Sequence, residues 1–306
     1  MDALPAVPTM PPSLAGTLAV ILAGACYGAI PVFARLARDA GVDSAGMVFL
    51  RFTLAALMLV LWMRTTRLAW PRGRTLIALA AMGAVGYTGM SLCFFGALRT
   101  VPAGTVSLLL YLYPALVLAI SALLFGEALS RRRIAALLLS LAGLAVTVGA
   151  GYGGDAMGLA LGVGSALFYS VYVVVGGRYA WRVHPLAATT VVMCAGAVSN
   201  GALLLASGSL TLPQGAAGWA GVLLLALIST VVATALFLAG MARVGASRAS
   251  LLSTSEPLFT LLFAAALLGE PMGASQLIGG ALIIAGVLCA AGDSRARAEP
   301  RPQAAG

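Results

Sequence analysis

The chain has 306 residues, of which 61% are hydrophobic and 9% are charged. Soluble domains carry about 25% charged residues. The composition therefore excludes a soluble globular fold and favours spans of roughly 20 apolar residues in a bilayer. The net charge of +9 comes from arginine alone, because the chain contains no lysine. We interpret this charge as a signal of membrane orientation, and we expect no nucleic-acid partner.

Ten apolar segments along the chain are each long enough to cross a membrane. Backbone N–H and C=O groups cannot stay unpaired in lipid, so such segments must be helical. In chain order, the predicted spans are 14–36, 46–64, 75–97, 103–125, 132–150, 156–177, 186–206, 217–239, 248–268 and 275–291. The predicted fold class is an all-α polytopic membrane protein with ten transmembrane helices.

Arginines concentrate in every second connection. The connections after spans 2, 4, 6 and 8, together with the C-terminal tail, hold most of them, whereas the intervening connections hold Arg35, Arg38 and Arg99. Positively charged loops stay in the cytoplasm. The pattern therefore predicts that both termini are cytoplasmic, with residues 1–13 and 293–306 as tails.

The second half of the chain repeats features of the first half at a fixed distance of 143 residues. Glu256-Pro257, Gly269-Glu270 and Ala285-Gly286 correspond to Tyr113-Pro114, Gly126-Glu127 and Ala142-Gly143. A period this long indicates a duplicated half-protein, so we assign 14–150 and 151–292 to two five-helix repeats. Five helices end opposite the side where they began. The second repeat is therefore inverted, as in secondary transporters with a substrate site near the membrane midplane.

The duplicated chain resembles the ten-helix EamA-type members of the drug/metabolite transporter superfamily, from span 1 to span 10. The resemblance is carried by Arg51-Phe52, Pro114, Gly126-Glu127, Glu256-Pro257, Gly269-Glu270, Gly279, Gly280 and Gly286. It implies a carrier in the inner membrane, most often an exporter of amino acids, related metabolites or drugs. It implies a class of cargo and no particular substrate.

Glu256 lies about a third of the way into span 9. An ionisable group at that depth costs ~2.5 kcal/mol or more and marks a functional site or a buried pair. It could contact a substrate amine or couple proton movement to transport, or it could be a structural carboxylate bonded to backbone groups near Pro257. Its counterpart in the first repeat is Tyr113, so any charge role belongs to one half only.

We expect structural roles for the other charged residues near the spans. Arg51 lies near the outer end of span 2 and could recognise a carboxylate, but we favour snorkelling to the interface or helix packing. We expect no pairing with Glu256, because the two lie at different depths. Glu127 and Glu270 each follow a helix-ending glycine and precede a helix whose N-terminal dipole favours an acid.

Prolines and midplane polar groups outline a substrate path. Pro31, Pro114 and Pro257 predict kinks that leave room for a cavity. The candidate path residues are Tyr27, Tyr87, Tyr111, Tyr113, Tyr169, Thr230, Ser253, Ser255 and Glu256, which fall in spans 1, 3, 4, 6, 8 and 9. The alternative is that the tyrosines belong to the interfacial belt and the hydroxyls to helix packing. Spans 5 and 10 are expected at the periphery.

Other function classes fit the sequence less well. Without lysine there is no Walker-type nucleotide site. The single histidine, His184, lies in a loop, and no Gly-x-Ser-x-Gly or His-Glu-x-x-His motif occurs. We expect no enzyme activity, no cofactor and no metal. The prediction is a carrier that exports amino acids or related metabolites by alternating access. A drug or amphiphile exporter, a channel and a membrane scaffold are the alternatives; proton coupling and the choice of monomer or homodimer stay open.

Overall fold

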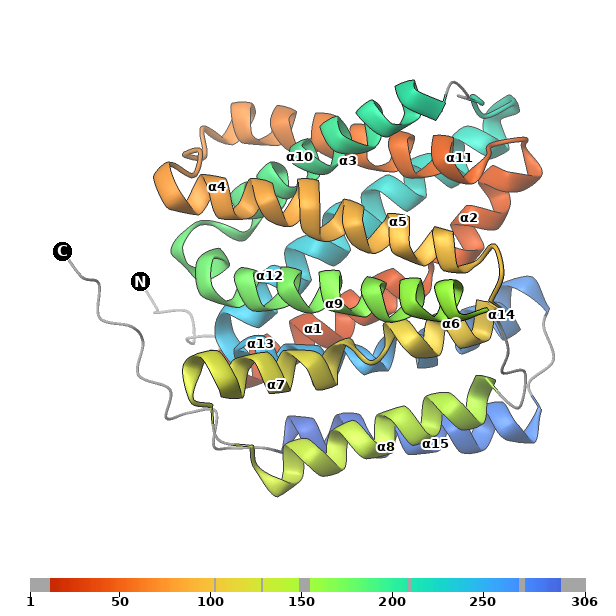
Figure 1. The fold of residues 1–306 in the computed structure, drawn as a ribbon. Helices are drawn as coiled ribbons and strands as arrows, with labels where there is room; N and C mark the ends of the chain where they lie inside the picture. Colours follow the sequence, from red (N-terminus) through yellow and green to blue (C-terminus); the bar gives the residue numbers. More distant parts are fainter. Residues whose placement is uncertain are drawn as a thin grey trace, which may run out of the picture.

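A computed structural model describes residues 12–101, 103–127, 129–148, 155–207, 211–269 and 273–292. Within these ranges every regular element is a helix (Figure 1). Nine of the described helical segments are long and apolar enough to cross a membrane, by length and composition. The predicted all-α membrane fold is confirmed. The tenth predicted span is α8 (Arg131–Val148), which differs from the nine because three arginines occupy its first turn.

Each half of the chain provides five helical passes, several of them built from more than one element. The first half contains α1 (Pro12–Gly28), α2 (Ile30–Asp39), α3 (Ser44–Thr66), α4 (Gly73–Ala81), η1 (Met82–Tyr87), α5 (Thr88–Ala97), α6 (Ala103–Leu110), α7 (Tyr113–Phe125) and α8. The second contains α9 (Ala156–Tyr179), η2 (Ala180–Arg182), α10 (Pro185–Ser207), α11 (Gly215–Ala226), η3 (Leu227–Val232), α12 (Ala233–Val244), α13 (Ala246–Leu252), η4 (Ser253–Ser255), α14 (Glu256–Leu268) and α15 (Ala274–Ala291).

The two halves interlock instead of standing side by side. Helix α1 packs along α12, α9 packs along α5, α3 lies beside α10, and α8 lies beside α15 (Figure 1). Each of these pairs joins the first half to the second. One hydrophobic core, which includes Phe52, Tyr172 and Phe237, therefore runs through both halves. This arrangement suits apolar helices, which associate in lipid through close packing.

Helices α8 and α15 form one edge of the molecule (Figure 1). Their contact depends on glycine, because a Cβ atom on Gly279 would lie 2.5 Å from the Gly143 carbonyl oxygen. A Cβ atom on Gly286 would lie 2.8 Å from the Ala136 carbonyl oxygen. Small residues let membrane helices approach backbone to backbone. The two glycines therefore hold this pair together.

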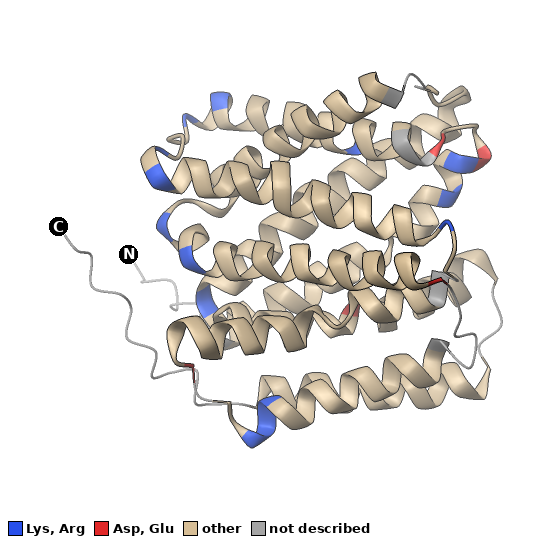
Figure 2. Cartoon of the chain, in the orientation of Figure 1, with Lys and Arg blue, Asp and Glu red and all other residues tan. Residues whose placement is uncertain are grey.

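Charged residues gather at the helix ends, and the basic ones favour one end of the molecule, on the left in Figure 2. We call this the arginine-rich end; its residues include Arg64, Arg72, Arg74, Arg131, Arg132, Arg133, Arg178, Arg182 and Arg243. The opposite end holds Arg35, Arg38 and Arg99 with Asp39, Asp43 and Asp155. Which end faces the cytoplasm stays a prediction.

Candidate functional site

Arg51 is held inside the helical bundle by both halves of the chain. Its side chain lies about two turns into α3 and leaves 9% of the residue exposed. Nε donates to Thr230 Oγ1 (2.5 Å), and Nη2 donates to the Ser229 carbonyl oxygen (3.0 Å) and the Tyr87 hydroxyl (3.3 Å). The snorkelling interpretation is therefore wrong, because the guanidinium points to buried partners instead of the interface.

The partners of Arg51 come from two π-helical segments at equivalent places in the repeats. Tyr87 ends η1, and Ser229 and Thr230 lie in η3. At each segment a threonine hydroxyl donates to a carbonyl five residues earlier: Thr88, directly after η1, to Gly83 (3.2 Å), and Thr230, in η3, to Leu225 (2.8 Å). Such π-bulges often occur at functional sites. They turn polar side chains from both halves toward one arginine.

Glu256 begins α14, directly after the buried 3-10 turn η4. The Tyr111 side chain lies next to its carboxyl group. Helix α1 packs against this region through glycine, because a Cβ atom on Gly24 would lie 2.7 Å from Ser255 Oγ. Glu256 and Arg51 form no ion pair within the described residues. Glu256 and Arg51 therefore occupy separate positions inside the bundle.

A continuous chain of aromatic rings connects the two charges. Tyr87 contacts Phe52 (4.8 Å between ring centroids) and Tyr172 (5.9 Å), edge to face in both cases. Tyr172 stacks on Tyr169 at 5.6 Å. From Tyr169 the chain continues to Tyr113 (4.6 Å) and on to Tyr111 (6.2 Å). The rings thus run from the partner of Arg51 to the partner of Glu256.

The remaining candidate path residues lie around this chain and bond mainly across the two repeats. The Tyr27 hydroxyl pairs with Thr234 Oγ1 (2.9 Å), and the Tyr113 hydroxyl pairs with Ser253 Oγ. Ser255 Oγ is buried and has no hydrogen-bond partner among the described residues. All the candidates therefore come together in one interior region, where several serve packing as well.

Each predicted kink lies where a helical pass is interrupted. Pro31 follows the break between α1 and α2, Pro114 the break between α6 and α7, and Pro257 the turn η4. In all three cases the proline occupies the first turn of the next helix, where its missing N–H group costs no hydrogen bond. The breaks at Pro114 and Pro257 thus lie at equivalent places in the two halves, whereas the break at Pro31 has no counterpart, because α9 is continuous.

Glu127 has a more specific position than the sequence suggested. It follows Gly126, which ends α7 with φ +67°, and its Oε2 accepts from Arg133 Nη1 (3.0 Å) and from Ser247 Oγ (2.6 Å). Ser247 belongs to the second repeat, so Glu127 links the halves at the arginine-rich end. Its counterpart Glu270 lies outside the described residues.

Sequence reasoning missed three residues that build this region. Tyr172 is 1% exposed and central to the ring chain, but α9 is apolar on all sides, so no periodic stripe marks its inner face. Its spacing of three from Tyr169 is the signal that could have identified it. Ser247 was assigned to a connection and Arg248 to the first position of the span 248–268; both are buried in α13, where Arg248 donates to the Ala291 carbonyl oxygen.

The site offers separate positions for a negative and a positive group. The observed hydrogen bonds of Arg51 use Nε and Nη2, which leaves the N–H groups of Nη1 available as donors. Glu256 remains partly exposed and can accept from a cation. Tyrosine rings between them provide apolar area with hydroxyl edges. Among the described residues, no group of His, Cys, Asp or Glu is arranged to hold a metal ion.

Access to Glu256 differs between the two directions along the same pass. Helix α13 and η4 precede it toward the arginine-rich end, and all their residues from Ser247 to Ser255 are buried. Helix α14 continues toward the other end, and none of its residues is buried. This pass is therefore buried on the arginine-rich side of Glu256 and more exposed on the opposite side.

Comparisons with known proteins agree with this architecture. The sequence profile of the EamA-like transporter family matches residues 14–149 and 156–292. An "Uncharacterized transporter" from Archaeoglobus fulgidus is 28% identical over 275 residues, covering 90% of this chain and 96% of that protein. A "Probable terminal-alkyne amino-acid exporter" from Streptantibioticus cattleyicolor is 29% identical over 257 residues, covering 81% and 84%.

A solved crystal structure shares the fold. Its TM-score is 0.78 at 24% sequence identity, and the match covers 91% of this chain and 97% of the other. At this identity the similarity concerns the fold alone.

Proposed function

Because this chain belongs to the EamA-like transporter family, we propose that it exports amino-acid-like zwitterions across the inner membrane by alternating access. As a member of that family it is a multi-pass membrane transporter. The proposed orientation has both termini in the cytoplasm, so the arginine-rich end faces the cytoplasm. Cargo, direction, membrane and orientation are parts of the proposal.

The observation that carries the proposal is the pair of opposite charges inside the bundle. The substrate carboxylate binds the free Nη1 donors of Arg51, and the substrate ammonium binds Glu256 and the Tyr111 hydroxyl. The substrate side chain packs on the tyrosine rings. An amino-acid exporter among the relatives supports this class of cargo.

The conformation supports alternating access. Burial of α13 and η4 closes the arginine-rich side, and the Glu127–Ser247 bond joins the halves there. Release of the substrate then occurs from the looser α14 side, which is the outside in the proposed orientation. For the next cycle the Glu127–Ser247 contact opens, and the α14 side closes.

The test is counterflow exchange of labelled amino acids in proteoliposomes that contain the full chain. We expect exchange by the wild type and at least about a tenfold loss in Arg51→Gln and in Glu256→Gln, because each removes a charge-assisted bond to substrate. Arg99→Gln, exposed at the opposite end, and Glu299→Gln, in the C-terminal tail, are the matched controls. Unchanged exchange in both site variants would contradict the proposal.

An imposed pH gradient separates the two roles of Glu256 that the sequence left open. If the acid binds the substrate ammonium, Glu256→Gln loses exchange with and without the gradient. If it couples protons, the variant keeps exchange and loses only the response to the gradient. Transport of amphiphilic drugs in place of any amino acid would favour the alternative cargo.

A further inference from the structure

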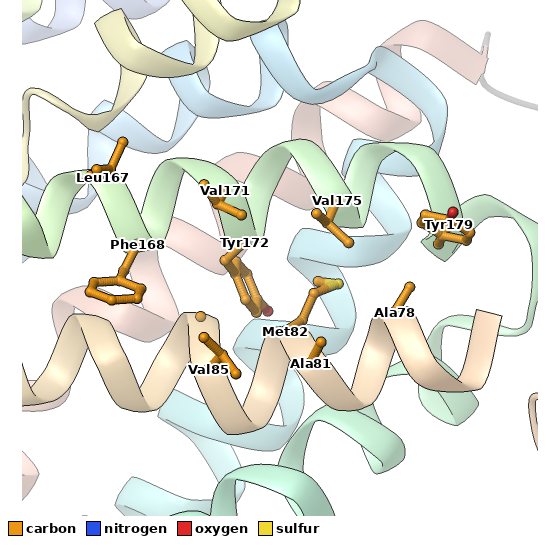
Figure 3. Close-up of a pocket in the computed structure, with 11 residues that line it drawn as sticks. Ala78, Ala81, Met82, Val85, Leu167, Phe168, Val171, Tyr172, Val175 and Tyr179 are labelled. Atoms are coloured by element: carbon orange, nitrogen blue, oxygen red, sulfur yellow. The ribbon is translucent and has the colours of Figure 1, made fainter. Parts of the chain in front are cut away.

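A long apolar groove lies on the surface of the bundle, on the outer side of Tyr172. It has a volume of about 510 Å³ and runs between α4–η1 and α9 (Figure 3). One wall presents Ala78, Ala81 and Val85, and the other presents Val171, Val175 and Tyr179. Figure 3 shows Ala78 facing Tyr179 at one end and Val85 facing Phe168 at the other.

The groove opens toward lipid. Val85 is 58% exposed in the middle of a membrane pass, and Leu167 and Val171 at the rim are also exposed. Met82 and Tyr172 form the floor and are buried. Because the lining is apolar and the surrounding surface is a membrane span, the occupant must be hydrocarbon supplied by the bilayer.

The length of the groove matches one leaflet. From Tyr179 to Phe168 is eleven helical residues, or about 16 Å at 1.5 Å per residue. This is about half of the roughly 30 Å hydrocarbon core of a bilayer. The groove therefore extends from the arginine-rich interface to the midplane and stops there.

Both walls lead to an arginine at the interface. Arg74 precedes Ala78 by four residues and lies one turn beyond it on the same face of α4. On the α9 wall, the Arg182 guanidinium lies over the Tyr179 ring at 5.3 Å from its centroid. Glu127, the acid described at this end, is paired with Arg133. The mouth of the groove therefore carries positive charge.

We propose that the groove binds one acyl chain of an anionic phospholipid from the leaflet at the arginine-rich end. The chain fills the space between the helices, and the headgroup binds Arg74 and Arg182. Basic pockets between membrane helices bind anionic headgroups in this way. The occupant rests against Tyr172, which stacks on Tyr169 inside the bundle, so lipid and substrate site share one ring as a wall.

Native mass spectrometry of the purified full chain tests this inference, with phosphatidylglycerol and phosphatidylcholine of identical chains as probes. We expect the wild type to retain one phosphatidylglycerol in preference to phosphatidylcholine. Val85→Trp fills the groove and should lower retention about tenfold or more. Arg74→Gln with Arg182→Gln should also lower retention about tenfold or more, because both arginines bind the headgroup.

Matched controls make the result specific. Val198→Trp changes an equally apolar position on α10 that is 74% exposed and away from the groove. Arg64→Gln with Arg243→Gln removes the same charge at the same end. Both controls should retain lipid like the wild type. If Val85→Trp fails to fold, Ala81→Phe fills the groove from another exposed position on the same wall.

Three outcomes would overturn the inference. Equal retention of both lipids by the wild type would show that the groove does not select an anionic headgroup. If both groove-filling variants retain lipid like the wild type, the lipid does not bind in the groove. Equal loss in Val85→Trp and Val198→Trp would mean that the lipid is a non-specific annulus. None of these readouts depends on the transported substrate, so they are independent of the proposed function.

Discussion

Arg51 joins the two repeats through a geometry that only arginine provides. Its planar guanidinium reaches Thr230, Tyr87 and the Ser229 carbonyl oxygen at the same time, in the directions of two different helices. A lysine ammonium keeps the charge but presents one compact point on a flexible chain. The shape of the group therefore matters here as well as its charge.

We expect Arg51→Lys to lower the thermal stability of the detergent-purified protein. The loss should be of the order of 1.5–3 kcal/mol, the range for hydrogen bonds to a charged group. A thermal melt followed by tryptophan fluorescence measures it, with Arg99→Lys as the exposed control. Equal melting temperatures for the two variants would show that the bonds to Arg51 contribute nothing.

Glu127 and Arg133 form a nearly buried pair, with side chains 13% and 6% exposed. Glu127→Gln leaves the Arg133 charge without its carboxylate, and breaking a buried pair typically costs ~3–5 kcal/mol. We expect a clear fall in melting temperature for Glu127→Gln and a smaller fall for the double variant Glu127→Gln/Arg133→Gln. Asp39→Asn, at an exposed position, is the control for loss of an acid. A double variant less stable than the single one would contradict this account.

The sequence identified the kinds of residue in the site better than their contacts. Glu256, Thr230 and the tyrosines were found because polar groups are rare in apolar spans. The orientation of the Arg51 side chain was misjudged, because the depth of a residue in its span does not say in which direction its side chain points. Tyr172 was missed for a related reason: α9 is apolar around its whole circumference, so its pattern does not tell a lipid-facing side from an inward side.

At the scale of the elements, interruptions within passes determine where the polar groups lie. Prolines mark three of these breaks and could be found from sequence. The π segments η1 and η3 contain no proline and were not predicted. They are accompanied by local hydroxyl bonds to backbone carbonyls and, at Gly83, by close packing against α10, and neither has a pattern that marks a π segment in the sequence.

The contact between α8 and α15 provides a direct test of element packing. Gly279→Ala places a methyl group against the Gly143 carbonyl oxygen, and overpacking costs typically ~1–3 kcal/mol. Gly164→Ala is the matched control, because its methyl group would meet Cys93 Sγ at an ordinary 3.4 Å. We expect a lower melting temperature for Gly279→Ala and no loss for Gly164→Ala. No difference between the two would show that the helices can separate without cost.

At the scale of the whole molecule, the two halves are tied at both ends of the passes. Ser247 donates to Glu127 at the arginine-rich end (2.6 Å), and Thr211 donates to Asp43 at the other (2.5 Å). The two EamA-like halves could be predicted from the sequence, because prolines, glycines and hydropathy repeat along the chain. The inversion of the second half stays a prediction. The sequence does not predict which end is closed, since this depends on contacts between the halves.

Cysteine labelling tests the closed side. In a background without the four native cysteines, Thr260→Cys on α14 should react with a water-soluble maleimide, and Ser250→Cys on α13 should be protected. Glu127→Ala removes the acceptor of the Ser247 hydroxyl and should increase labelling of Ser250→Cys. Protection of Thr260→Cys with reactive Ser250→Cys would mean that the opposite side is closed.

The central claim is that the site between Arg51 and Glu256 selects molecules that carry both a carboxylate and an ammonium. The most direct measurement is counterflow exchange by wild-type proteoliposomes of one labelled amino acid against three unlabelled competitors. These are the same amino acid, its amide without the carboxylate and its hydroxy acid without the ammonium. We predict that only the amino acid competes. Equal competition by the amide or by the hydroxy acid would contradict the account.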